Sequence, residues 1–143
     1  MKQLEPETSP NERALLFMFS RVEIVTHIGL ELLDWGEDFA RVRMPFSSFI
    51  DNRSGTALGG AIATLIDIAG AASVWAGHDF SQGGKHATVG LSINFIGAGR
   101  QQDLIATARC LRRQRELNFV QVDVETESGV LAATAQMTFR VVS

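Results

Sequence analysis

One carboxylate, Asp67, interrupts an otherwise apolar segment. Residues 57–77 read ALGGAIATLIDIAGAASVWAG and carry a single formal charge, which predicts a helix that is hydrophobic nearly all round and buried in a core. An ionised carboxylate in such a place is costly unless it is well hydrogen-bonded or used in chemistry. Two alternatives therefore stay open: a structural aspartate bonded to a backbone amide or an arginine, and a functional one.

The helix face around Asp67 is built from small residues. At 100° per residue, the positions within about 60° of it are Gly60, Ala63, Thr64, Gly70, Ala71 and Val74. Larger side chains such as Ile62 and Leu65 fall on the opposite face. We therefore expect the bulky face to pack on a sheet. Asp67 should then look out from a shallow trough that admits another backbone or a thin ligand.

Gly59 and Gly60 open the same helix. Unpaired amides at a helix N-terminus bind anions or developing oxyanions, although two glycines can also simply turn the chain. Asp67 lies about 11 Å further along the axis, too far for both groups of one helix to act on one carbonyl. Two antiparallel helices related by a two-fold axis would bring each N-terminus to the other's Asp67. The chemistry thus predicts a homodimer with composite sites.

The remaining elements supply a sheet for this helix. Ser9-Pro10-Asn11-Glu12 marks a helix start, and apolar spacing extends that helix to about residue 24. Extended runs are predicted at 28–35, 39–45, 87–96, 103–113, 117–127 and 130–142. Their short connections suit antiparallel neighbours. We expect an α+β protein with one long central helix covering an antiparallel sheet, and a short N-terminal helix.

Alternation within 87–96 assigns two faces to that strand. Val89, Leu91, Ile93 and Phe95 share one face, and Thr88, Gly90, Ser92 and Asn94 share the other.

Composition excludes several classes of protein. The 143 residues, 45% apolar and 20% charged, fit one domain, with residues 1–9 expected as a flexible tail. The net charge of −3 and scattered Lys and Arg give no stripe for nucleic acid. Cys110 is the only cysteine, and His27, His78 and His86 lack metal spacing, so no metal site is expected. With no signal-like N-terminus, and with Asp67 opposing a membrane span, we expect a cytoplasmic protein.

Residues 52–67, NRSGTALGGAIATLID, resemble a known motif. The hotdog-fold thioesterases, specifically the PaaI-like acyl-CoA thioesterases, have Asn, two residues, Gly, a short apolar step, His-Gly-Gly, then six residues to Asp or Glu. The spacing agrees throughout. Flanking matches, including Thr88 to Phe95, extend the resemblance over roughly residues 25 to 141.

The resemblance implies a single hotdog domain over residues 1–143, with the sheet wrapped around the long helix. Asp67 would be the catalytic carboxylate, acting on water as general base or on the thioester carbon as nucleophile. The amide of Gly59 would polarise the thioester oxygen, Asn52 would help to hold water or the carbonyl, and Thr88 would bond Asp67 or the water. Substrate binding would fall to Leu58, Gly60, Gly90, Ala98, Gly99 and Arg100.

The implied substrate is an acyl-CoA or a related thioester. Coenzyme A enters as part of that substrate, with no metal or redox cofactor, and the protein works as a homodimer or a dimer of dimers. Arg100, with Arg112, Arg113 and Arg115, is interpreted either as ordinary solvated charge or as a cationic group for the coenzyme A phosphates.

Leu58 departs from the family pattern, which has His there. The imidazole's hydrogen bond or proton is therefore missing, and a non-catalytic acyl-CoA-binding hotdog protein remains the alternative. The loop at Ala98-Gly99 also lacks the proline often found there. A dehydratase or hydratase would need a histidine paired with a carboxylate, and no histidine is suitably placed.

Overall fold

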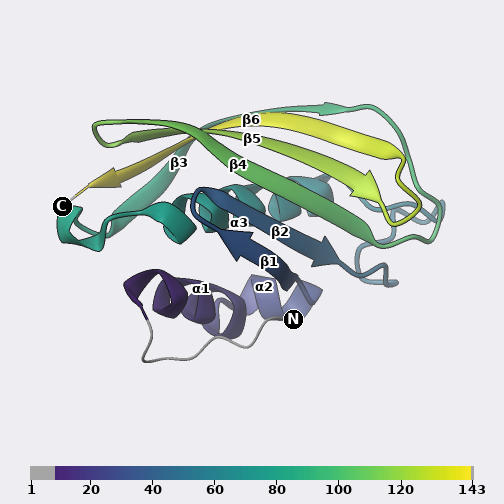
Figure 1. The fold of residues 1–143 in the computed structure, drawn as a ribbon. Coiled ribbons are helices and arrows are strands. Elements are labelled where there is room, and N and C mark those ends of the chain that lie inside the picture. The colour runs from purple at the N-terminus through teal and green to yellow at the C-terminus, as the bar shows by residue number, and fades with distance from the viewer. Residues whose placement is uncertain (1–8, 143) are drawn as a thin grey trace.

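The computed structural model describes residues 9–142 as one six-stranded antiparallel sheet arched over a long helix (Figure 1). In chain order the elements are α1 (Pro10–Arg21), α2 (Glu23–Ile28), β1 (Glu31–Gly36), β2 (Phe39–Met44), α3 (Gly59–Gly77), the 3₁₀ turn η1 (Phe80–Gln82), β3 (Lys85–Phe95), β4 (Leu104–Gln114), β5 (Leu117–Thr126) and β6 (Leu131–Val142). The strand order is β1-β2-β4-β5-β6-β3. The α+β class and the central helix are confirmed. Residues 1–8 of the tail expected over residues 1–9 lie outside the described residues.

α3 forms the centre of the core. Its Leu65, Ile66 and Ala69 are fully buried, and the strands supply Val42 and Val122 to the same cluster. By length and composition alone α3 could cross a bilayer, but 61% of its most apolar window is buried inside the fold. That burial is what a core helix requires, because the sheet removes its apolar side chains from water.

The N-terminal helices follow the sequence prediction at their start but not at their end. Ser9 caps α1 by accepting a hydrogen bond from the Glu12 amide at 3.1 Å. The predicted helix to residue 24 and the strand from residue 28 are wrong, because the helix breaks at Val22 and α2 continues to Ile28. α2 ends where Gly29 adopts a left-handed conformation with φ +85°.

β3 is an edge strand with an irregular register. Thr88 lies opposite Phe139 and Leu91 opposite Met137, with a bulge between Thr88 and Gly90. Strict alternation had put Thr88 and Leu91 on opposite faces. The bulge adds one residue, so both now face α3, and that part of the predicted alternation is wrong.

Gly97 fixes the end of β3 against β6. Its amide donates to the Ala132 carbonyl at 3.1 Å, and an added Cβ would lie 2.8 Å from the carbonyl oxygen of Leu131. That oxygen belongs to the backbone and cannot swing aside. We expect Gly97→Ala to lower the free energy of unfolding by about 1–3 kcal/mol in urea denaturation. Gly36→Ala, whose Cβ would meet nothing within 4 Å, is the control. Equal losses in the two variants would contradict this packing argument.

Candidate active site

Asp67 lies midway along α3, half-buried, and is held by one hydroxyl. Thr88 Oγ1, on the exposed edge strand, donates a hydrogen bond to Asp67 Oδ1 at 2.6 Å. Within residues 9–142 its hydrogen-bond partner is this hydroxyl, not the backbone amide or arginine of the structural alternative. The carboxylate is therefore accessible and oriented, with acceptor capacity left for a further donor such as water.

The trough around Asp67 is open over only half of its predicted length. Gly60 is exposed with open space around it, and Ala63 and Thr64 are half-buried. Gly70, by contrast, faces the sheet, because a Cβ there would collide with Met137, and Val74 is fully buried. The sequence prediction is wrong for the C-terminal half, since the curved sheet covers that part of the helix. The open strip runs from Gly60 to Asp67.

The N-terminus of α3 forms the other end of this strip. Leu58 is the N-cap residue, exposed and without a side-chain capping hydrogen bond. Its carbonyl accepts from the amides of Ala61 at 2.9 Å and Ile62 at 3.1 Å. The amides of Gly59 and Gly60 come before these, so the helix offers them no acceptor. Gly59 and Asp67 are about 12 Å apart along the axis, too far to serve one carbonyl.

Asn52 lies in the loop before the helix and binds within that loop. Its side-chain amide donates to Thr56 Oγ1 at 2.7 Å, and its Oδ1 accepts from the Ser54 amide at 2.8 Å. The loop is tight, with Arg53 at φ 72° and Gly55 at φ 85°. The structure does not bring Asn52 to the Asp67 of the same chain, and both polar ends of its side chain already have partners.

The loop after β3 docks on the loop before α3. The Gln101 amide donates to the Gly55 carbonyl at 2.7 Å, and the Arg100 guanidinium would lie 3.2 Å from a Cβ on Gly55. Ala98 is exposed, whereas Gly99 lies against Thr126. Arg100 therefore lies against Gly55, which is four residues before Gly59 on the loop that leads into α3.

The cationic group proposed from sequence does not assemble. Arg100 precedes the start of β4, and Arg112, Arg113 and Arg115 lie at its far end. An eleven-residue strand separates these ends by about 33 Å. The grouping was wrong because nearness along a chain says nothing of proximity when the intervening residues are extended.

Gly90 also lies away from Asp67. It pairs with Thr138, on the face opposite to Leu91 and Met137, so it faces away from α3. There it lines an outer-face groove of about 410 Å³ beside Leu111 and Phe119.

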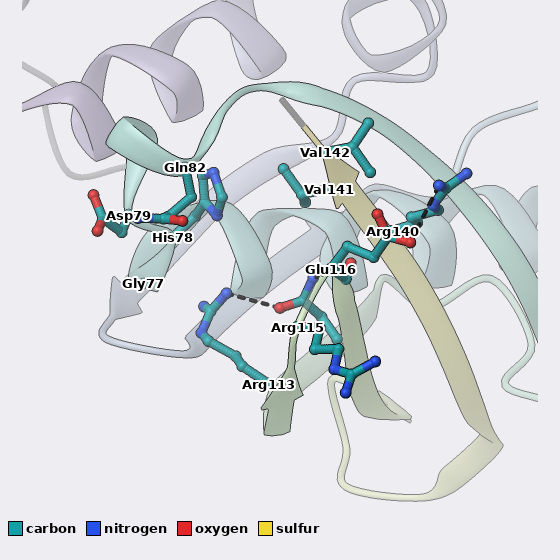
Figure 2. Close-up of a pocket in the computed structure, with 11 residues that line it drawn as sticks. Gly77, His78, Asp79, Gln82, Arg113, Arg115, Glu116, Arg140, Val141 and Val142 are labelled. Carbon is teal, nitrogen blue, oxygen red and sulfur yellow. Dashed lines mark hydrogen bonds and ion pairs between the residues drawn. The ribbon is translucent and has the colours of Figure 1, made fainter.

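A cavity of about 570 Å³ lies at the C-terminal end of α3 (Figure 2). Two of its three arginines are engaged: Arg113 pairs with Asp38 and donates to the Val74 carbonyl at 2.9 Å, and Arg140 pairs with Glu116 at 3.2 Å. This cluster satisfies a helix carbonyl and ties the turn between β4 and β5 to β6, so its role is structural. At its rim, hydrogen bonds from the Ser81 hydroxyl and amide lower the pKa of the Asp79 carboxyl.

Burial raises the pKa of the Cys110 thiol, which keeps it protonated. The ring of Phe95 approaches the helix N-terminus, with its Cε1 and Cζ atoms 3.6 Å from where a Cβ on Gly59 would be. Alternation put Phe95 on the apolar face of its strand, but no sequence signal places it beside Gly59.

Comparisons with known proteins agree with this geometry. The sequence profile of the Thioesterase superfamily matches residues 54–133. A Haemophilus influenzae protein named "Putative esterase" is 28% identical over 121 residues, 83% of this chain and 85% of that relative. The PaaI protein from the E. coli phenylacetic acid degradation operon superposes with a TM-score of 0.82 at 18% identity, covering 94% of each chain. A hypothetical thioesterase from Streptococcus pneumoniae, solved with coenzyme A, gives 0.72 at 23% identity over 80% of this chain and 87% of its own.

The sheet wrapped around one long helix is the hotdog fold, which the PaaI structure shares. The family profile spans more than half of the chain and contains Gly59, Asp67 and Thr88. The chain belongs to the thioesterase superfamily.

Proposed function

We propose that this protein hydrolyses acyl-CoA thioesters to a free acid and coenzyme A. The observation that carries the proposal is the open strip of α3, which has a hydroxyl-held carboxylate at one end and uncapped amides at the other. A carboxylate and a preorganised pair of amides are the groups that acyl transfer to water requires.

The proposed site needs two chains. Gly60 and Asp67 lie at opposite ends of the open strip, so a two-fold axis near Ala63 would set Gly60 of one chain against Asp67 of the other. β3 supports this arrangement, because it is a sheet edge that is exposed at every position except Ile93 and carries Val89 and Leu91 in contact with water. An unpaired apolar edge favours pairing with another strand, here the same strand of a second copy.

In the proposed reaction, water attacks the thioester carbon. Asp67 of one chain accepts the proton from that water, and the Gly59 amide of the other stabilises the negative charge on the carbonyl oxygen. Collapse of the tetrahedral intermediate breaks the C–S bond, and the thiolate of coenzyme A leaves and is protonated. If Asp67 attacks directly, an acyl anhydride forms first and water then cleaves it. Neither route uses a metal or a redox cofactor.

Coenzyme A is proposed as the leaving group for two reasons. The Streptococcus pneumoniae relative of the same fold binds it. In this chain, the exposed Arg100 lies against Gly55 on the loop that leads into α3, and a guanidinium there suits phosphate.

Thiol release from a panel of acyl-CoAs tests the proposal. We expect wild-type protein to hydrolyse at least one acyl-CoA, with one free thiol released for each molecule of free acid formed. The second candidate, an acyl-CoA-binding protein without turnover, is favoured by exposed Leu58 in place of a polar side chain. It predicts binding of acyl-CoA without any thiol release, and that result would overturn the proposed hydrolysis.

Thr88→Val is expected to lower kcat about 10-fold or more while leaving the fold intact. The exposed hydroxyl holds Asp67 Oδ1 at 2.6 Å, and a hydrogen bond to a charged group contributes about 1.5–3 kcal/mol. Valine keeps the shape but cannot donate. Steady-state thiol release measures the effect, with Thr88→Ser as the matched control that restores the donor. Unchanged kcat in Thr88→Val would show that the bond to Asp67 has no part in turnover.

A further inference from the structure

Phe95 contributes an exposed aromatic ring beside the proposed oxyanion position. Its ring edge lies 3.6 Å from the Cβ position of Gly59, yet the residue is 56% exposed. Phe95 pairs with Ala133 on β6, and the side chain of Ala133 is fully buried in the core. Paired residues point to the same face, so the Phe95 ring emerges from the face of the sheet that covers α3. The ring therefore borders the helix N-terminus and keeps a free surface for a ligand.

The backbone next to Phe95 is held against β6. The amides of Ile96 and Gly97 both donate to the Ala132 carbonyl, at 2.8 Å and 3.1 Å. The close approach of Gly97 to the Leu131 carbonyl leaves no room for a different path. Because this backbone is already ordered, binding of a ligand against the Phe95 ring incurs no entropy cost for ordering the loop.

The loop before α3 and the surroundings of Gly59 differ in charge. Arg100 lies against Gly55 on the loop side, and that side suits the anionic part of a coenzyme A thioester. Leu58, 55% exposed, and Phe95 are apolar and uncharged neighbours of the same amide. A neutral hydrocarbon gains from contact with such surfaces, whereas a phosphate or a carboxylate would lose its hydration there.

From this arrangement we infer that Phe95 determines acyl specificity. Its ring, with Leu58, forms the wall against which the first carbons of the acyl group lie when the thioester oxygen is at the Gly59 amide. The site then favours acyl groups that are apolar next to the carbonyl and discriminates against a hydroxyl at that position, because the wall offers it no hydrogen-bond partner. This inference rests on the proposed function. It adds which acyl groups the site selects, namely those that are apolar next to the carbonyl.

Binding of an unreactive thioether tests the inference without requiring turnover. Calorimetry would compare S-hexyl-coenzyme A with free coenzyme A on wild-type protein, Phe95→Ala and the neighbouring control Ile96→Ala, whose side chain is equally exposed. We expect Phe95→Ala to raise the Kd of the thioether about tenfold, equivalent to about 1.4 kcal/mol, and to leave that of coenzyme A unchanged. Ile96→Ala should change neither. Equal weakening for both ligands, or no weakening, overturns the inference.

Turnover of two matched thioesters provides the second readout. Wild-type protein should hydrolyse hexanoyl-CoA with a kcat/KM about tenfold above that of 2-hydroxyhexanoyl-CoA, and Phe95→Ala should reduce this preference. A preference that persists in Phe95→Ala overturns the inference and leaves the proposed hydrolysis standing. If wild-type protein releases no thiol at all, the hydrolysis fails instead, and the thioether binding still decides the role of Phe95.

Discussion

Asp67→Asn is expected to lower kcat for acyl-CoA hydrolysis about 10²–10⁴-fold, the usual contribution of a positioned general base. Asparagine keeps the size of the side chain and can still accept the Thr88 hydrogen bond, but it cannot take a proton from water. The fold should not suffer, because Asp67 is only half-buried. Thiol release under saturating substrate measures the loss.

Asp123 provides a matched control for this substitution. It is also half-buried, and it accepts a hydrogen bond from a threonine hydroxyl, that of Thr134, at 2.8 Å. Asp123→Asn therefore repeats the same chemical change in the same kind of contact, away from α3. We expect it to keep the wild-type rate. If both variants lose activity alike, or if neither does, Asp67 has no special part in the reaction.

Gly59→Pro is expected to lower kcat about 10²–10³-fold, the effect of losing one oxyanion donor. Proline removes the amide hydrogen and adds a ring, and the first position of a helix tolerates both. The preceding residue is already suitable, since Leu58 has φ −59° and ψ 139°, which is the conformation favoured before proline. Loss of activity with an unchanged circular dichroism spectrum would therefore report the donor and not the fold.

Gly59→Ala separates the amide from the glycine itself. It restores the N–H, and its Cβ would meet the Phe95 ring at 3.6 Å, an ordinary van der Waals distance. We expect Gly59→Ala to retain most of the activity that Gly59→Pro loses. Were alanine and proline equally inactive, the space beside Phe95 would matter rather than the hydrogen-bond donor.

The sequence predicts the sheet, the central helix and the motif well, because each depends on local pattern. The Ser9 cap and the burial of Leu65 follow from the types and spacing of nearby residues. The boundary between α2 and β1 was wrong because Val25 and Ile28 fit a short helix as well as an extended run, and only the conformation of Gly29 decides between them.

The errors within the site come from tertiary structure. Helical geometry placed Gly70 on the open face with Asp67, but the curvature of the sheet covers it with Met137. Strict alternation put Thr88 on the face opposite to Leu91, but a single bulge in β3 turns Thr88 to the face that covers α3. The contact between Phe95 and Gly59 joins residues far apart in the chain, so no local pattern could indicate it.

Each proposed active site combines Gly59 of one chain with Asp67 of the other, and a dimer that contains two different variant subunits tests this arrangement most directly. Asp67→Asn and Gly59→Pro subunits, each carrying a different affinity tag, would be co-expressed and the mixed dimer purified. One of its two sites would then combine an intact Gly59 from the first chain with an intact Asp67 from the second. We predict about half of the wild-type activity in the mixed dimer, although each parent homodimer is inactive. A mixed dimer as inactive as its parents would contradict the shared site.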